Sequence, residues 1–223
     1  MKRVLLWLLC SLTTSTVFAS SAVKLPGSSE QYLPLLSESI DTFWPEIPNR
    51  TFPAGVIMQE SGWKEHATLK TSRELGCGLG QFTKTYDANG KIRFDTLTDL
   101  TRASPDLRGW TWKDCYNTRF QLKAVVIKLK MGDRDCKAVM AGPLNQLACD
   151  AAKYNGGAGS VSKRIRYCQA RANCNPKEWF NHLEKQCPQS NKRVAGYGES
   201  FCEINSKYPG RVFKHMIRFD GRV

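Results

Sequence analysis

The sequence has few histidines and lacks the short motifs that mark the commonest metal and nucleophile sites. The 223 residues include three histidines, His66, His182 and His215, and none lies in an HExxH spacing. No two cysteines form a CxxC pair, so a zinc site is the weaker interpretation of the cysteines. No GxSxG segment occurs either, which disfavours an enzyme with a serine nucleophile.

Features typical of membrane-embedded or disordered chains are also missing. Beyond residue 22 no apolar run reaches the length of a membrane helix, and the chain has no internal repeat or low-complexity block. Apolar residues make up 41% and charged residues 24% of the chain, which is ordinary globular usage. Roughly 200 residues follow the N-terminal segment, enough for a single domain with a real core.

Acidic residues are scarce relative to basic ones. The chain has 33 Lys and Arg against 20 Asp and Glu, a formal net charge of +13. Such a charge attracts polyanions, among them the anionic polymers of a bacterial envelope. No basic repeat interleaved with aromatics and no nucleic-acid motif is present, so we expect envelope polymers as partners and no nucleic acid.

The first residues have the pattern of a signal peptide. Lys2 and Arg3 supply positive charge, Val4 to Leu12 form a short apolar run, and Val17-Phe18-Ala19 is a small-residue cleavage site. We predict a signal peptide at 1–19, cleaved after residue 19 or 22, and a linker at 20–29. The protein is then exported, to the periplasm or outside the cell, with a charge of +11 and no stable membrane anchor.

Cysteine usage agrees with export. Of the nine cysteines, Cys10 lies in the predicted signal peptide, and the other eight form an even set. The eight are Cys77, Cys115, Cys136, Cys149, Cys168, Cys174, Cys187 and Cys202. We predict four disulfides, as in secreted domains, and the sequence leaves about 105 pairings open.

Apolar spacing predicts a mostly helical single domain over 30–223, with a cysteine-rich helical C-terminal part. Helices are predicted at 30–44, 53–62, 95–102, 116–131, 136–141, 145–154, 160–172, 177–187 and 199–219. Residues 63–90 lose helical periodicity, contain Gly76, Gly78 and Gly80, and end in the turn signal Asp87-Ala88-Asn89-Gly90. We therefore predict an α+β fold, predominantly α, with a small β or loop lobe and disulfide staples.

Glu60 is the candidate for chemistry. It lies in the last turn of the predicted helix 53–62, which Gly62 ends, and the helix dipole there disfavours a negative charge. Val56 and Ile57 place apolar side chains on the same helix face. Both effects raise the pKa of the carboxyl, and a carboxylic acid that stays protonated near neutral pH is what cleavage of a glycosidic bond needs.

Three downstream segments join Glu60 in an ordered pattern. Gln59-Glu60-Ser61-Gly62 is followed by Ser72, by Gly78-Leu79-Gly80-Gln81, and by Ala152 to Gly157 with the sequence AKYNGG. The pattern resembles the soluble lytic transglycosylase family of the lysozyme-like superfamily, which carries Glu-Ser, Ser, Gly-Leu-Met-Gln and Ala-Tyr-Asn segments in this order. In this chain Gly80 replaces the Met, and Lys153 is inserted before Tyr154.

The resemblance covers about half of the predicted mature chain and implies a lysozyme-like fold and a reaction. The substrate is the glycan strand of peptidoglycan, cut between N-acetylmuramic acid and N-acetylglucosamine with formation of a 1,6-anhydro product. Glu60 is then the general acid and base. The implied substrate-binding residues are Ser72, Gly78, Leu79, Gln81, Tyr154 and Asn155. A phage-encoded or secreted bacterial monomer without cofactor or metal is expected.

Two other functions stay open from the sequence. A hydrolytic lysozyme needs a second carboxylate beside Glu60, for which Glu65, Glu74 and Asp87 are candidates. A cationic protein that binds the envelope without catalysis is also consistent with the charge and the disulfides. Four aromatics are candidates for stacking on sugars but are more often core residues. They are Trp63, Phe82, Trp110 and Trp112.

Overall fold

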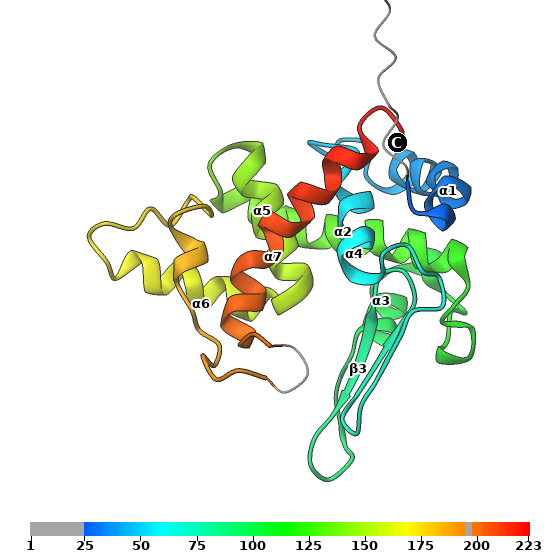
Figure 1. Ribbon diagram of the computed structural model, residues 1–223, viewed down its shortest axis with the longest axis horizontal. Coiled ribbons are helices and arrows are strands. Elements are labelled where there is room, and N and C mark those ends of the chain that lie inside the picture. Colours follow the sequence, from blue (N-terminus) through cyan, green and yellow to red (C-terminus); the bar gives the residue numbers. More distant parts are fainter. Residues whose placement is uncertain (1–24, 195–197) are drawn as a thin grey trace, which may run out of the picture.

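The structure is a computed structural model that describes residues 25–194 and 198–223. The predicted signal peptide, its cleavage sites and the first half of the predicted linker lie outside the described residues. Within them the fold is mostly helical, with seven α-helices and one small antiparallel sheet, as predicted for an α+β chain that is predominantly α (Figure 1).

The helices and strands follow one another with the sheet inserted between the second and third helix. The helices are α1 (Gly27–Phe43), α2 (Phe52–Ser61), α3 (Thr96–Ala103), α4 (Thr118–Val139), α5 (Gly142–Gly156), α6 (Ala158–Gln169) and α7 (Phe201–Met216). The strands are β1 (Thr68–Lys70), β2 (Glu74–Cys77), β3 (Phe82–Tyr86) and β4 (Ile92–Asp95). Their order in the sheet is the order in the chain, as short hairpins produce. Four short 3₁₀ turns complete the described elements: η1 (Pro105–Leu107), η2 (Trp112–Asp114), η3 (Leu183–Lys185) and η4 (Ile217–Phe219).

Three predicted element boundaries need correction. The first helix begins at Gly27, so 27–29 of the predicted linker are helical. The predicted helices 116–131 and 136–141 are one continuous helix, α4, in which Gly132 is tolerated. The predicted helix at 177–187 is wrong, because only the turn η3 forms there and Asn181 has a φ of 65°, outside the helical region.

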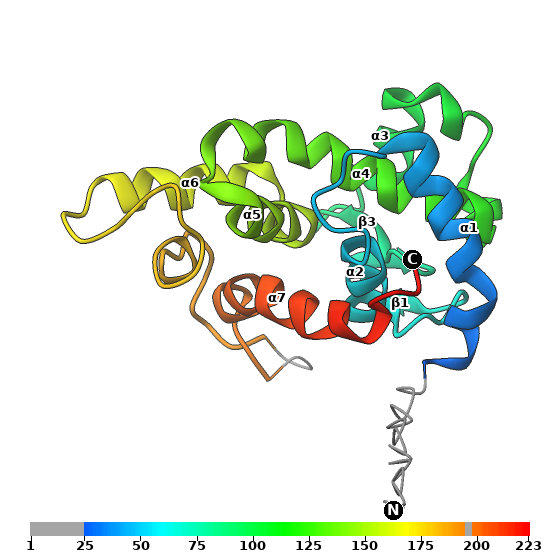
Figure 2. The same cartoon turned by 90° about the horizontal axis from the view of Figure 1, so that it is seen from above.

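Helix α2 is enclosed by the other helices. Figure 2 shows it between α4 and α7, and it packs against both. Residues Phe52 to Ile57 of α2 are all buried, as a helix surrounded on several sides requires. The main hydrophobic core forms around it, and Trp44 and Trp63 are among the largest buried side chains. The sheet projects from this helical body on one side (Figure 1).

The cysteine-rich part has a small core of its own. It contains Trp179, Leu183 and two disulfides, and Phe213 of α7 packs against both this cluster and the main core. All eight predicted cysteines are bridged, each to its neighbour in the sequence. The pairs are Cys77–Cys115, Cys136–Cys149, Cys168–Cys174 and Cys187–Cys202. Four disulfides are typical of an oxidising, exported environment. No helix within 25–194 and 198–223 has the length and apolarity that crossing a membrane requires.

Candidate active site

Glu60 lies at the end of α2, where the chain turns toward the sheet. Gly62 caps the helix in the left-handed region with a φ of 59°, and its backbone N–H donates to Met58 O at 3.0 Å. The predicted position of Glu60 in the last helical turn and the stop at Gly62 are thus confirmed. The side chain of Glu60 lines a cleft of about 630 Å³.

The cleft lies between the sheet and the helical body. The sheet and its edges contribute Leu69, Glu74, Gln81, Thr83, Phe94 and Thr96. The helices contribute Glu60, Lys128, Lys153, Tyr154, Asn155, Gly156 and Gly157. Glu60 comes from α2, Lys128 from α4 and the rest of the helical wall from the end of α5 and its cap. The cleft therefore brings together segments that are far apart in the sequence.

Tyr208 fixes the carboxyl of Glu60. It lies on α7, 148 residues away in the chain, and its hydroxyl donates to Glu60 Oε1. The tyrosine is buried, with 3% of its surface exposed. Burial away from water raises the pKa of Glu60 to about 6, although the Tyr208 hydroxyl and the charge of Lys128 both favour the carboxylate. Desolvation is the larger effect, so roughly a tenth of the Glu60 carboxyls carry a proton at pH 7, far more than for an ordinary glutamate.

Lys128 places a cation in the same wall. Its Nζ lies 3.6 Å from the centre of the Tyr154 ring and donates to Tyr154 O at 3.3 Å. Desolvation lowers the pKa of Lys128 to about 8, and the charge of Glu60 opposes that shift. Stacking on an aromatic face and a backbone acceptor partly replace the water that the ammonium loses.

Tyr154 connects the helical wall to the loop between β2 and β3. Its hydroxyl donates to Gly80 O at 2.7 Å. A Cβ at Gly80 would lie 2.7 Å from that hydroxyl and 2.7 Å from Val125 Cγ2, closer than real Cβ atoms approach. The packing of Tyr154 therefore requires a glycine at position 80, where the family-like pattern has Met.

Gln81 and Asn155 both line the cleft, as predicted substrate-binding residues should. Gln81 has a φ of 44°, and its side-chain amide donates to Ala67 O at 3.0 Å and Gly78 O at 2.9 Å. These bonds hold the β2–β3 loop and use both amide hydrogens, which leaves Oε1 as the group that can accept from a ligand. Asn155 is exposed, and its Oδ1 accepts from Asn205 Nδ2 at 3.2 Å.

The other three predicted binding residues lie outside the cleft lining. Gly78 is buried with a φ of 71°, and a Cβ there would lie 2.3 Å from Gln121 Oε1. Leu79 is a core residue whose backbone N–H donates to the same Gln121 oxygen. Ser72 lies in the exposed turn between β1 and β2. Gly78 and Leu79 thus contribute to the packing around Gln121 and the core and do not line the cleft.

Of the three candidates for a second carboxylate, one shares the cleft with Glu60. Glu74 begins β2 and lines the cleft, and burial raises its pKa. Glu65 instead accepts from Tyr32 at 3.4 Å, away from the cleft lining. Asp87 caps the β3–β4 hairpin by accepting from the backbone N–H groups of Asn89 and Lys91 at 2.8 and 2.9 Å.

Most of the predicted aromatic candidates belong to the core. Trp63, Phe82 and Trp110 are buried. Trp112 is partly buried and donates from Nε1 to Asp95 at 2.9 Å. Besides Tyr154, the cleft lining contains Phe94 of β4, which is 47% exposed and which the sequence reasoning did not select.

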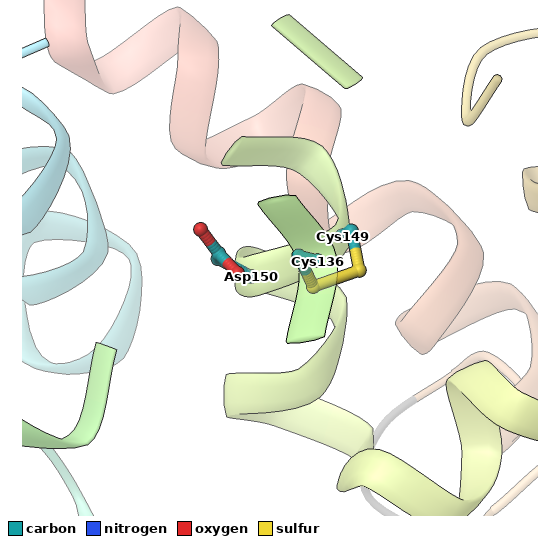
Figure 3. A group of neighbouring side chains, drawn as sticks. All are labelled: Cys136, Cys149 and Asp150. Atoms are coloured by element: carbon teal, nitrogen blue, oxygen red, sulfur yellow. A yellow bond between two sulfur atoms is a disulfide. The ribbon is translucent and has the colours of Figure 1, made fainter. Parts of the chain in front are cut away.

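One group of potential metal ligands lies close together within the described residues: Cys136, Cys149 and Asp150, all buried (Figure 3). The two sulfurs form a disulfide, so neither is a thiolate that could bind a cation. The carboxyl of Asp150 has no hydrogen-bond partner, and burial together with nearby Asp133 raises its pKa to about 9. This group is a disulfide beside a protonated carboxyl, not a metal centre.

Sequence reasoning missed Tyr208 and Lys128, the two residues that most affect Glu60. Nothing near Tyr208 in the sequence marks it, because only the return of α7 across α2 brings it to the carboxyl. Lys128 did carry a signal in the sequence, since it is the one charged residue in the otherwise apolar run from Ala124 to Leu129. Comparison with known protein families and with curated proteins finds no match to this chain, so the residues of the cleft carry the functional conclusion.

Proposed function

We propose that this protein is a lytic transglycosylase that cleaves the glycan strands of peptidoglycan. The observation that carries the proposal is the carboxyl of Glu60, which lines a cleft of about 630 Å³ and has a pKa raised to about 6. Gln81, Tyr154 and Asn155, three of the six binding residues that the family-like pattern implies, line the same cleft. A raised carboxyl pKa in a groove large enough for sugar rings is the setting that a glycosidic general acid requires.

The reaction follows from the two protonation states of one carboxyl. Protonated Glu60 gives its proton to the bridging oxygen of the β-1,4 bond, and the bond from that oxygen to C1 of N-acetylmuramic acid breaks. The acetamido oxygen of the same sugar stabilises the positive charge at C1. Ionised Glu60 then takes the proton of the C6 hydroxyl while O6 bonds to C1. The acid is regenerated, water is not consumed, and a 1,6-anhydro sugar results.

Tyr208 and Lys128 support both halves of this cycle. The Tyr208 hydroxyl orients the carboxyl and donates to it when it is ionised. The ammonium of Lys128, which lines the same cleft, also stabilises the negative charge of ionised Glu60. Desolvation favours the protonated acid that begins the cycle, and these two groups favour the base that ends it. A pKa near 6 makes both states accessible near neutral pH.

The proposal also includes where the protein acts and what it binds. A signal peptide at 1–19 directs the chain to the periplasm or outside the cell, where peptidoglycan is found. The net charge of +11 that remains without the signal peptide favours residence on anionic envelope polymers. The enzyme acts as a monomer, uses no cofactor and binds no nucleic acid.

A second candidate function is a hydrolytic lysozyme, and Glu74 is the observation that favours it. Glu74 lines the cleft with Glu60, so it could activate a water or stabilise the cation at C1. Mass spectrometry of digested peptidoglycan separates the two reactions, because the anhydro product is lighter than the hydrolysed product by one water. Glu74→Gln retains most activity in a transglycosylase and loses it in a two-carboxylate lysozyme.

The decisive variant is Glu60→Gln, which keeps the shape of the side chain and removes its acid. We expect turnover of purified cell walls to fall by about 10²–10⁴-fold, the usual contribution of a general acid. Glu65→Gln is the matched control, because Glu65 lies close in the chain but not in the cleft lining. If Glu60→Gln lyses cell walls as well as the parent, the protein is a cationic envelope-binding protein and the enzymatic proposal is wrong.

A further inference from the structure

A second pocket continues the cleft toward the start of α7. This side pocket has a volume of about 320 Å³ and shares Glu74, Asn155 and Gly156 with the cleft that contains Glu60. Gln189, Phe201, Ile204 and Asn205 complete its lining. These four residues come from the cysteine-rich C-terminal part, which lies outside the segments that resemble the transglycosylase family. The side pocket is thus an extension of the cleft built by a different part of the chain.

The polar side of the side pocket is held in place by hydrogen bonds. Asn205 is 2% exposed, and its Nδ2 donates to Ala152 O at 3.1 Å and to Asn155 Oδ1 at 3.2 Å. Gln189 donates from Nε2 to Asn205 Oδ1 at 3.3 Å. A Cβ at Gly156 would lie 2.3 Å from Asn205 Nδ2, so only glycine allows this approach. The amides are therefore fixed before any ligand binds.

The apolar side is an exposed aromatic on a rigid support. Phe201 is the first residue of α7 and is 52% exposed. Ser200 and Glu203 form a capping box at this helix start, which fixes the backbone of Phe201. The disulfide Cys187–Cys202 ties the first turn of α7 to the segment that carries Gln189. The disulfide thus links the two chain segments that carry Phe201 and Gln189, both of which line the side pocket.

We propose that the side pocket is a saccharide subsite, which binds an N-acetylated sugar of the same glycan strand beyond the rings next to Glu60. The proposal rests on the proposed function, because the ligand is the continuation of the strand in the cleft. A sugar ring has an apolar C–H face and a polar edge. Phe201 offers an aromatic surface to the face. At the edge, Asn155 offers its Nδ2 and Gln189 its Oε1 to the hydroxyl and acetamido groups, because both amide hydrogens of Gln189 already go to Ser160 Oγ and Asn205 Oδ1.

Soluble oligomers of N-acetylglucosamine, from two to six sugars, test the subsite in the Glu60→Gln protein. Binding is followed by calorimetry and by the NMR signal of the Ile204 methyl group, which lies in the pocket lining. We expect the Ile204 signal to shift with the long oligomers and not with the disaccharide. Adding Phe201→Ala should weaken binding of the hexamer by about two- to tenfold, the usual contribution of an aromatic contact, and leave the shortest bound oligomer unaffected.

Tyr167→Ala is the matched control, since Tyr167 is a 45% exposed aromatic on α6 that lines neither pocket. It should leave the affinity for every oligomer unchanged. The subsite is refuted if Phe201→Ala binds the hexamer like the parent, if the Ile204 signal ignores every oligomer, or if no oligomer binds. The proposed function has its own test, because wild-type protein that releases anhydro products remains a transglycosylase even when the subsite fails.

Discussion

Removing the hydroxyl of Tyr208 should raise the pKa of Glu60. In Tyr208→Phe the donor to Glu60 Oε1 is lost, while the buried ring that shields the carboxyl from water remains. A hydrogen bond to a charged group contributes about 1.5 kcal/mol, and about 1.4 kcal/mol corresponds to one pKa unit. We therefore expect the pKa to rise from about 6 by about one unit, to about 7.

The raised pKa of Glu60 also makes the free energy of unfolding depend on pH, because the pKa differs between the folded and unfolded states. An unfolded Glu has a pKa of about 4.3, so between about pH 4 and pH 6 the folded protein retains a proton that the unfolded chain loses. Stability therefore decreases as the pH rises through this window. In Tyr208→Phe the window extends to about pH 7, which adds about 1.4 kcal/mol to the loss of stability between pH 4 and pH 8.

Two measurements check this prediction without using activity. Carboxyl ¹³C NMR titration, with Glu60→Gln to assign the signal, reports the pKa directly, and thermal unfolding from pH 4 to pH 8 reports the linkage. Tyr32→Phe is the matched control, because Tyr32 donates to the carboxylate of Glu65, at 3.4 Å. An unchanged or lower pKa of Glu60 in Tyr208→Phe would refute the reasoning that this hydroxyl stabilises the carboxylate of Glu60.

Further predictions concern residues that support the cleft. Asp150→Asn keeps the shape of a protonated acid, so its unfolding free energy should exceed that of the parent by about 5 kcal/mol at pH 8, at about 1.4 kcal/mol for each pH unit above 4, and approach it at pH 4. Denaturant titrations at the two pH values would show this. The sign follows because the buried acid keeps its proton up to about pH 9 while the unfolded chain ionises near pH 4. Gly80→Ala should destabilise by about 1–3 kcal/mol in thermal unfolding, because the added methyl collides with the Tyr154 hydroxyl. Gly210→Ala, which adds a methyl to a helix position with nothing within 4 Å, should stabilise by about 0.5–1 kcal/mol in the same assay, and the opposite order would contradict the packing described here.

Local patterns in the sequence predicted the elements and the central acid. Apolar spacing placed α2, and the αL stop at Gly62 placed Glu60 in its last turn, because capping and helical periodicity depend on neighbouring residues. The even set of eight cysteines predicted four disulfides, because cysteines in an exported protein are oxidised in pairs. The predicted helix at 177–187 failed because Asn181 adopts a backbone conformation that apolar spacing does not report.

Only the tertiary structure decided which groups meet Glu60. The return of α7 across α2 brings Tyr208 to a carboxyl 148 residues away, and no local pattern encodes such a contact. The sequence offered Glu65, Glu74 and Asp87 alike as candidates for a second carboxylate. Only the packing shows that Glu74 shares the cleft, whereas Glu65 and Asp87 form hydrogen bonds elsewhere. The sequence therefore predicted both the candidate acid Glu60 and the direction of its pKa shift, whereas the burial that raises the pKa to about 6 arises only when distant elements pack together.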